Sequence, residues 1–95
     1  MYALIRKYEG LDAGVRDTAS RKANAELRPI LAASPGFVSY ELLEHEGQPE
    51  CVSSISVFKT RADAEASSKV AEEWVHANLP SMTKPSRVAG ELVAH

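Results

Sequence analysis

The chain is short of cysteine, of aromatic residues and of charge of one sign. One cysteine, Cys51, among 95 residues cannot form an internal disulfide; this is typical of a protein in a reducing cytoplasm. The formal net charge is -2, with lysine and arginine scattered among aspartate and glutamate. Because no basic stripe is present to displace counterions from a phosphate backbone, nucleic acid is not an expected partner.

Long apolar runs and targeting signals are missing as well. The longest apolar stretches are far shorter than the ~20 residues of a membrane span, so no membrane association is expected. Met1 to Ile5 leads directly into Arg6 and Lys7, without the basic start and apolar middle of a signal peptide. The sequence therefore predicts a cytoplasmic protein.

Common catalytic and ligand-binding motifs are also lacking. There is no glycine-rich phosphate loop and no Gly-x-Ser-x-Gly turn. No two histidines have the spacing of metal ligands, and Cys51 has no neighbouring cysteine or histidine. A metal site is therefore not expected.

The order of apolar runs predicts the fold. Strand-like runs fill 2–8, 37–44, 51–58 and 88–94, and helical spacing fills the intervals from Asp12 to Ser34 and from Thr60 to Asn78. Two strands joined through a helix run parallel by a right-handed crossover. In this order such strands are not neighbours in the sheet, and neighbouring strands run antiparallel. The order therefore predicts one ferredoxin-like α+β domain over 1–95, with a four-stranded antiparallel sheet and both helices on one face.

The ends of the two helical segments carry recognisable signals. Asp12 is expected to cap the first helix, with Leu11 packing onto its first turn. Pro29 lacks an amide hydrogen and should kink this helix or begin a separate last turn. Thr60 and Asp63 have the spacing of a capping box before the second helix.

The strands carry apolar residues on both faces, for example Phe37 and Leu43 on one parity and Val38 and Leu42 on the other. Helices on one side would leave the second face in water, which monomers seldom tolerate. Burial of several hundred Å2 per subunit at ~25 cal/mol per Å2 contributes several kcal/mol, comparable with the stability of a small domain. We therefore expect a two-fold homodimer through the sheet faces.

The segment 35–42 reads Pro-Gly-Phe-Val-Ser-Tyr-Glu-Leu, the third strand ends in Val-Phe, the second helix is rich in alanine and 90–93 reads Gly-Glu-Leu-Val. With these features the chain resembles the dimeric α/β-barrel superfamily, and most closely its antibiotic biosynthesis monooxygenase branch. The resemblance covers nearly the whole chain. It implies a sheet-to-sheet dimer with a pocket between sheet and helices in each subunit.

Members of this superfamily include cofactor-independent oxygenases of aromatic or quinone-like substrates, haem-degrading enzymes and proteins of unknown activity. The haem-degrading members resemble one another through an asparagine on the first strand, with a tryptophan and a histidine at the pocket. Residues 2–8 contain no asparagine. Trp74 and His76 should project about 200° apart on a helix. No haem or other cofactor is therefore expected.

Trp74 is predicted to share the apolar face of the second helix with Ser67, Val70, Ala71 and Asn78. It can act as a flat wall for an aromatic ligand, with Ser67 and Asn78 as polar contacts. It can equally be a core anchor whose indole N–H finds a nearby acceptor. Large rings in small domains usually belong to the core, which favours the structural role.

Arg6, Tyr8 and Tyr40 lie on predicted strands. Tyr40 can donate to a bound carbonyl or a developing oxyanion, although aromatic residues are favoured in strands for structural reasons. Arg6 shares its strand parity with Tyr8 and can hold an anionic substrate. The alternative for Arg6 is a pair with Glu41 or Glu91 across the sheet or a dimer interface.

The sequence leaves two functions open. The first is a cofactor-independent monooxygenase acting on a small aromatic or quinone-like substrate. Its candidate residues are Arg6, Tyr40 and Trp74 for catalysis and Tyr8, Ser67 and Asn78 for ligand binding. The second is a non-catalytic, ligand-binding or structural homodimer. A cavity bordered by Trp74 with a converging hydroxyl or ionisable group would favour the first; Trp74 wedged against the first helix would favour the second.

Overall fold

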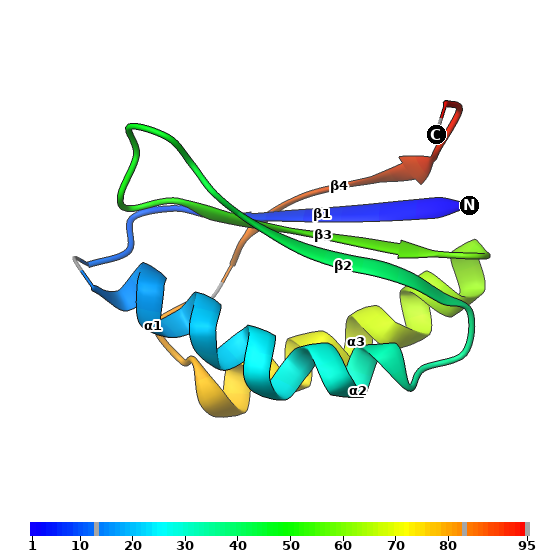
Figure 1. Cartoon of the computed structure of the whole chain (residues 1–95), viewed down its shortest axis with the longest axis horizontal. Coiled ribbons are helices and arrows are strands. Elements are labelled where there is room, and N and C mark those ends of the chain that lie inside the picture. Colours follow the sequence, from blue (N-terminus) through cyan, green and yellow to red (C-terminus); the bar gives the residue numbers. More distant parts are fainter. Residues whose placement is uncertain (13, 83, 95) are drawn as a thin grey trace.

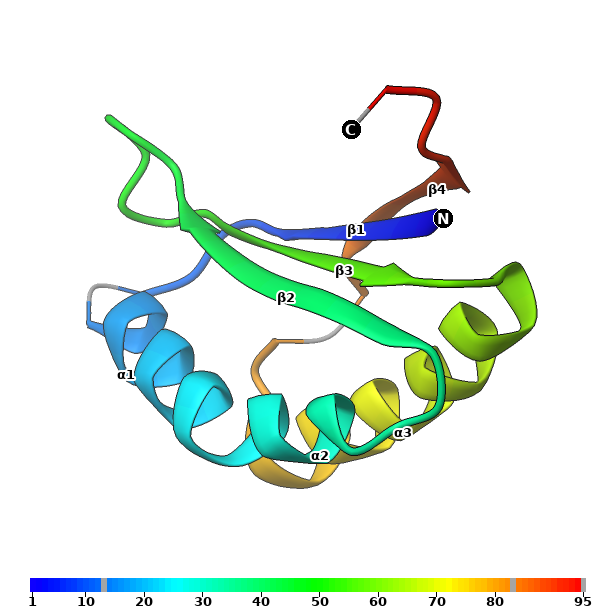
Figure 2. The same ribbon diagram turned by 45° about the vertical axis from the view of Figure 1, so that its right-hand side comes forward.

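A computed structural model describes residues 1–12, 14–82 and 84–94. The elements are β1 (Tyr2–Tyr8), α1 (Val15–Lys22), the π-helical turn η1 (Ala23–Leu27), α2 (Arg28–Ala32), β2 (Phe37–Glu44), β3 (Val52–Phe58), α3 (Arg61–Asn78) and β4 (Ser86–Glu91). The strands form one antiparallel sheet in the order β2-β3-β1-β4. The helices lie on one face of this sheet (Figures 1 and 2). The predicted ferredoxin-like α+β fold is confirmed.

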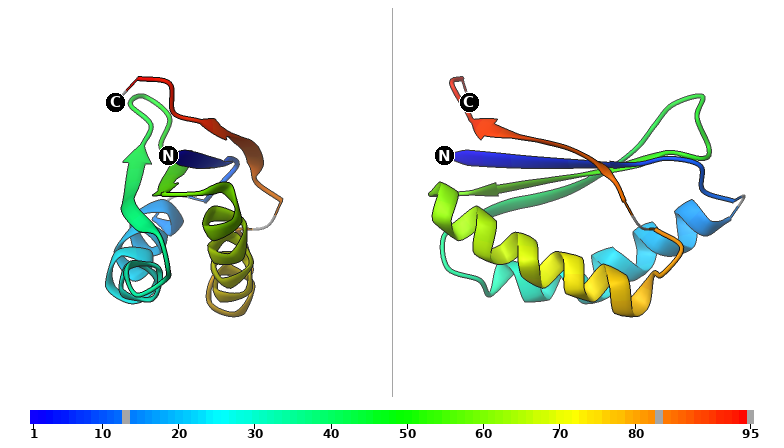
Figure 3. Two further views of the ribbon diagram at one scale, coloured as in Figure 1. Left: turned by 90° about the vertical axis from the view of Figure 1, so that its right-hand side faces the viewer. Right: turned by 180° about the vertical axis from the view of Figure 1, so that it is seen from behind.

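Two helical rods lie side by side beneath the sheet, as the end-on view in Figure 3 shows. One rod is α3, and the other is the succession of α1, η1 and α2. The face of the sheet away from these rods is called the outer face. None of the helices in the described part of the chain combines the length and hydrophobicity that crossing a membrane requires.

The first rod is interrupted at the proline, as the sequence predicts. Pro29 stands in the first turn of α2. In the preceding π-helical turn the Arg28 amide donates to the Ala23 carbonyl oxygen, five residues earlier. Because Pro29 has no amide hydrogen and its ring crowds the carbonyl four residues back, a widened turn relieves the clash and α2 begins as a separate helix.

The expected side-chain cap by Asp12 is wrong. Helix α1 begins after Gly14, whose φ of 83° is left-handed, and no side chain caps it. The backbone oxygen of Asp12 accepts the Val15 amide at 3.0 Å instead. Leu11 does pack beside Val15 in a cluster with Ala19, so the predicted apolar contact at this helix start is present.

Helix α3 begins where the sequence places it. Thr60 Oγ1 accepts the Asp63 amide at 3.1 Å, so the expected cap is present. The buried residues of this helix are Ala64, Ser67, Ser68 and Ala71. Val70, expected on the same face, is 39% exposed. Small side chains at spacings of three and four let the helix lie close to the sheet, and the larger Val70 lies at the side of this face, where it borders an opening together with Ser67.

A bulge in β2 changes which side chains face the helices. The register between β2 and β3 shifts at Val38. Phe37 consequently packs on the helix side with Tyr40, where its ring meets Phe58 edge-on with 5.9 Å between centroids. The expectation that Phe37 and Leu43 share a face is therefore wrong, because one extra residue reverses the alternation.

The bounds of β3 and β4 differ from expectation. Strand β3 begins at Val52, one residue later than predicted. Strand β4 occupies Ser86–Glu91 rather than 88–94. It pairs with β1 from Lys7 opposite Ser86 to Tyr2 opposite Glu91. The length of β4 therefore follows from where its partner begins, which the apolar pattern of 88–94 does not reveal.

Candidate functional site

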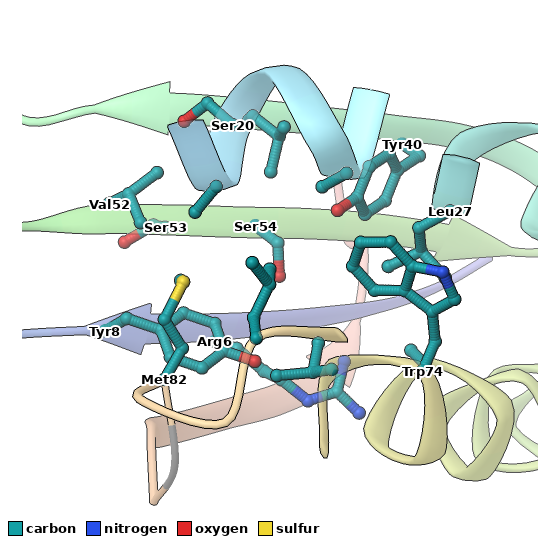
Figure 4. Close-up of a pocket in the computed structure, with 16 residues that line it drawn as sticks. Arg6, Tyr8, Ser20, Leu27, Tyr40, Val52, Ser53, Ser54, Trp74 and Met82 are labelled. Atoms are coloured by element: carbon teal, nitrogen blue, oxygen red, sulfur yellow. The ribbon is translucent and has the colours of Figure 1, made fainter. Parts of the chain in front are cut away.

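A cavity lies between the sheet and the helical rods, at the end of the sheet nearest α1. Its polar lining residues are Arg6, Tyr8, Ser20, Tyr40, Ser53 and Ser54, and its walls include Trp74, Val75 and Met82. Figure 4 shows these side chains around one space. The cavity volume is about 30 Å3, whereas one water needs about 10–15 Å3. This space, the inner cavity, therefore has room for about two waters in the present conformation.

Arg6 is held by helix α3. The residue is 4% exposed, and its Nη2 donates to the hydroxyl of Ser68 and, at 3.4 Å, to the Ser68 backbone oxygen. The same nitrogen lies 3.5 Å from Glu72 Oε1. A buried guanidinium needs acceptors and a counter-charge. Helix α3 supplies both: Arg6 pairs with Glu72 and not with Glu41 or Glu91, the partners considered as an alternative from the sequence.

Tyr8 and Tyr40 carry hydroxyls that remain protonated at neutral pH. Burial raises the pKa of Tyr8, with Arg6 opposing this effect and Glu72 adding to it. Burial also raises the pKa of Tyr40 to about 12; Tyr8 adds to this shift, while Arg28 and Arg6 oppose it. Both hydroxyls are therefore hydrogen-bond donors rather than general bases in this cavity.

The Tyr40 hydroxyl is in contact with the inner cavity. Every fully buried side-chain nitrogen or oxygen in the described part of the chain has a hydrogen-bond partner. The Tyr40 hydroxyl has no such partner within residues 1–12, 14–82 and 84–94, so it cannot be fully enclosed. The ring itself is fixed by packing, with the Arg28 guanidinium 5.4 Å from its centroid.

The sequence allows Trp74 to be a wall of a ligand pocket or a core residue, and the structure shows features of both. It borders the inner cavity, and it packs against a cluster that includes Leu27, Leu31 and Tyr40. The Asn78 side-chain amide donates to the Trp74 backbone oxygen at 2.9 Å. Trp74 is thus a wall of the cavity that is itself supported by the first helical rod.

The structure brings together four of the six candidate residues. Arg6, Tyr8, Tyr40 and Trp74 line the inner cavity, although they come from β1, β2 and α3. Ser67 instead lines a smaller space bordered by Leu4, Leu31 and Phe58. Asn78 bonds to its own helix and is not among the lining residues. The roles of all six in binding or catalysis stay predictions.

Ser68, Glu72 and Met82 were not found from the sequence. Ser68 and Glu72 stand four residues apart on α3, and this spacing on one helix face was the signal that could have linked them to Arg6. Met82, which is 6% exposed, reaches the cavity from the segment between α3 and β4. The path of such a connecting segment depends on tertiary packing, so no local signal identifies it.

The described lining residues of the inner cavity include no histidine, cysteine, aspartate or glutamate. In the described part of the chain, no group of three or more His, Cys, Asp or Glu residues could hold a metal ion. Neither His45 nor His76 lines the inner cavity. His45 Nε2 lies 2.7 Å from Ser53 Oγ, and His76 borders a separate opening. Trp74 and His76 therefore face different spaces, as their spacing predicts; His95 lies outside the described residues.

Fold and cavity together define the class of protein: a ferredoxin-like α+β protein with a small, mostly apolar cavity between helices and sheet. The sequence profile of the antibiotic biosynthesis monooxygenase family matches residues 1–77. The chain therefore belongs to that family. No curated protein matches the sequence.

Solved structures with the same fold include an oxygenase, a protein of unknown function and a porphyrin-bound protein. SnoaB, a cofactor-independent oxygenase from Streptomyces nogalater, is 15% identical with a TM-score of 0.74, over 99% of this chain and 94% of that one. A protein of unknown function from Nitrosomonas europaea is 20% identical with a TM-score of 0.78, over 99% and 90%. A MhuD variant with two manganese protoporphyrin IX molecules per active site is 21% identical with a TM-score of 0.77, over 100% and 97%. At these identities the likeness shows the fold.

Proposed function

We propose that the chain is a cofactor-independent monooxygenase that acts on a small aromatic or quinone-like, enolisable substrate. The observation that carries this proposal is the convergence of Arg6, Tyr8 and Tyr40 on one cavity beside Trp74. One cation and two neutral hydroxyl donors suit a bound oxyanion. Family membership and the described activity of SnoaB support the same reaction class.

The substrate must supply its own acidity. Among the described lining residues of the inner cavity there is no carboxylate and no imidazole, and both tyrosines are protonated. The positive charge of Arg6 favours the anionic form of a bound phenol or enol and so lowers its pKa. The protein therefore assists the reaction only by stabilising the substrate anion, and few residues are needed for that.

The proposed reaction balances without a cofactor. The substrate anion transfers an electron to O2, and recombination of the resulting radicals with uptake of a proton gives a hydroperoxide at carbon. Loss of water then converts CH–OOH into C=O. The net change is one CH2 group and one O2 to one carbonyl and one water. The protein orients the anion, stabilises its negative oxygen and excludes bulk water.

The inner cavity must widen to admit such a substrate. Met82 is the lining side chain best suited to move, because it comes from a connecting segment and its unbranched thioether adapts to different shapes. The small present volume and the packing of Trp74 on Leu27 and Leu31 favour the second candidate function. That function is a non-catalytic homodimer in which these rings complete the core.

Oxygen consumption with anthrone-like and quinol substrates separates the two functions. For the enzyme, Arg6→Met should lower kcat by about 100-fold, since loss of one oxyanion donor typically costs 100- to 1,000-fold. Arg87→Met is the matched control, because Arg87 lies opposite Arg6 on the exposed strand β4, and its kcat should stay within about twofold. Activity that survives in Arg6→Met contradicts the proposed role of Arg6. No consumption by the wild-type protein across the panel favours the non-catalytic function.

We also infer that the chain forms one domain over 1–95 and works as a homodimer in the cytoplasm. On the outer face, Val88, Ile5 and Ile55 lie in one row across three strands, and Val88 is 66% exposed. A second copy placed face to face would cover this row. The single cysteine supports a reducing compartment.

A further inference from the structure

The ion pair between Arg6 and Glu72 links a buried side chain to an exposed one. The Arg6 side chain is 5% exposed, whereas the Glu72 side chain is 57% exposed. Glu72 does not line the inner cavity; it borders a neighbouring opening together with Tyr8, His76 and Lys84. The carboxylate therefore reaches Arg6 from the solvent side, and the guanidinium faces the cavity from within.

Within the described part of the chain, every hydrogen bond of the Arg6 side chain is donated by Nη2, to Ser68 and Glu72. Nε and Nη1 of the guanidinium therefore have no partner among the described residues. In Figure 4 the Arg6 side chain crosses the floor of the cavity on its way to α3. Ser68 is neutral and buried, so it can hold the guanidinium in place whether or not Glu72 is charged.

The charge that a ligand meets in the cavity therefore depends on Glu72. Arg6 contributes a positive charge to a lining that includes no described acidic side chain. Glu72 offsets this charge from outside, across a 3.5 Å contact that water partly screens. A ligand anion beside Arg6 would be repelled by Glu72, while a neutral ligand of the same shape would not.

We propose that Glu72 is a specificity-determining residue, a built-in counter-ion that competes with ligand anions for Arg6 and so sets the preference of the inner cavity between anionic and neutral aromatic ligands. Ser68 holds Arg6 in position, and Glu72 sets its effective charge. This inference rests on the proposed function only in taking the inner cavity as the place where an aromatic ligand binds.

Trp74, the one tryptophan of the chain, gives a direct readout at the cavity wall. The probes are 2-naphthoate, which is anionic, and 2-naphthamide, which is neutral and of nearly the same shape. Quenching of Trp74 fluorescence measures the Kd of each probe for the wild-type protein, Glu72→Gln and Glu73→Gln. Glu73 is the matched control, because it is an exposed carboxylate on the same helix, whereas the ion pair of Arg6 is with Glu72.

Glu72→Gln should bind 2-naphthoate about fivefold more tightly, the size expected for removing a half-exposed charge beside the site. Its Kd for 2-naphthamide should not change, and Glu73→Gln should resemble the wild type with both probes. An equal change for both probes would mean that Glu72 acts on cavity shape, and an equal effect of Glu73→Gln would mean that only net charge matters. Either result, or an unchanged Kd for 2-naphthoate, overturns the inference.

The outcome is separable from that of the oxygen-consumption experiment. A charge-selective effect of Glu72→Gln in a protein that consumes no oxygen would support this inference and contradict the proposed enzyme. Oxygen consumption with no charge-selective effect would do the reverse. If neither probe quenches Trp74 at millimolar concentration, the inference about Glu72 fails, and oxygen consumption alone decides the proposed enzyme.

Discussion

The two faces of the sheet have opposite character where β1 and β3 pair. On the helix side, Arg6 lies opposite Ser54, and both are buried against the inner cavity. On the outer face, one residue further along, Ile5 lies opposite Ile55. A small monomer would be expected to place polar residues outside and apolar residues inside. In this sheet the pairs Arg6–Ser54 and Ile5–Ile55 show the reverse order.

The polar pair on the helix side and the apolar pair on the outer face indicate that the two faces of the sheet bind different partners. Buried polar groups cost free energy unless they are hydrogen-bonded, and here α3 supplies partners for Arg6 on the inner face. Apolar groups on an open face gain free energy only when another surface covers them. The inner face is therefore suited to a polar ligand atom, and the outer face is suited to a second subunit.

The largest effect should come from truncating a large side chain in the core between the sheet and the helices. Phe58 is 1% exposed and meets Phe37 edge-on. Phe58→Ala should lower the free energy of unfolding by about 3–5 kcal/mol, because it removes apolar contacts and leaves a cavity. Urea denaturation followed by circular dichroism measures the loss. Val70→Ala, at a partly exposed position on α3, is the control and should cost less than about 1 kcal/mol. Equal losses in the two variants would contradict the central role of Phe58 in the core.

Stability at alkaline pH tests the burial of Tyr40 beside the inner cavity. The pKa of Tyr40 is raised from 10.0 to about 12, so the folded state binds this proton more tightly than the unfolded state. The corresponding stability is fully present below about pH 10 and is lost as pH rises through 12. This loss should be on the order of 2–3 kcal/mol.

Urea denaturation at several alkaline pH values compares the wild-type protein with Tyr40→Phe, which cannot ionise at this position. The variant should lose less stability over this pH range than the wild-type protein. If both lose the same amount, the hydroxyl of Tyr40 is not held in its neutral form by burial.

A smaller effect is expected from a charge on the outer face. Val88→Glu should raise the Kd of the proposed dimer at least about tenfold, because symmetry places the added carboxylate in the interface twice. Sedimentation velocity over a range of micromolar concentrations measures the change. Val93→Glu is the matched control, because Val93 lies beyond β4 and is 97% exposed. A wild-type protein that sediments as a monomer throughout this range would contradict the dimer.

Most of the architecture could be read from local patterns. The strand at 2–8, the Thr60 cap and the break at Pro29 depend on residues that are neighbours in the chain, so sequence and structure agree there. The shift at Val38 and the bounds of β4 depend on pairing with another strand. Local patterns do not encode that pairing, and these expectations were wrong.

For the candidate site, the residue types in the sequence identified side chains capable of chemistry, but the sequence did not identify the partners with which these side chains interact. Arg6, Tyr8, Tyr40 and Trp74 stood out as chemically capable groups, and they do line one cavity. The choice of Glu72 over Glu41 or Glu91 as the partner of Arg6 required the tertiary structure. A side chain on a strand can reach whichever helix the crossover places above it, and a single sequence leaves several carboxylates equally eligible.

The sequence by itself determined the order of elements and hence the ferredoxin-like fold, because hydrophobic periodicity and helix ends are local properties of the chain. Only the tertiary structure decided which face of each strand looks toward the helices and which carboxylate neutralises Arg6. Both outcomes depend on where segments distant in sequence come into contact, and one bulged residue or one helical turn is enough to change them.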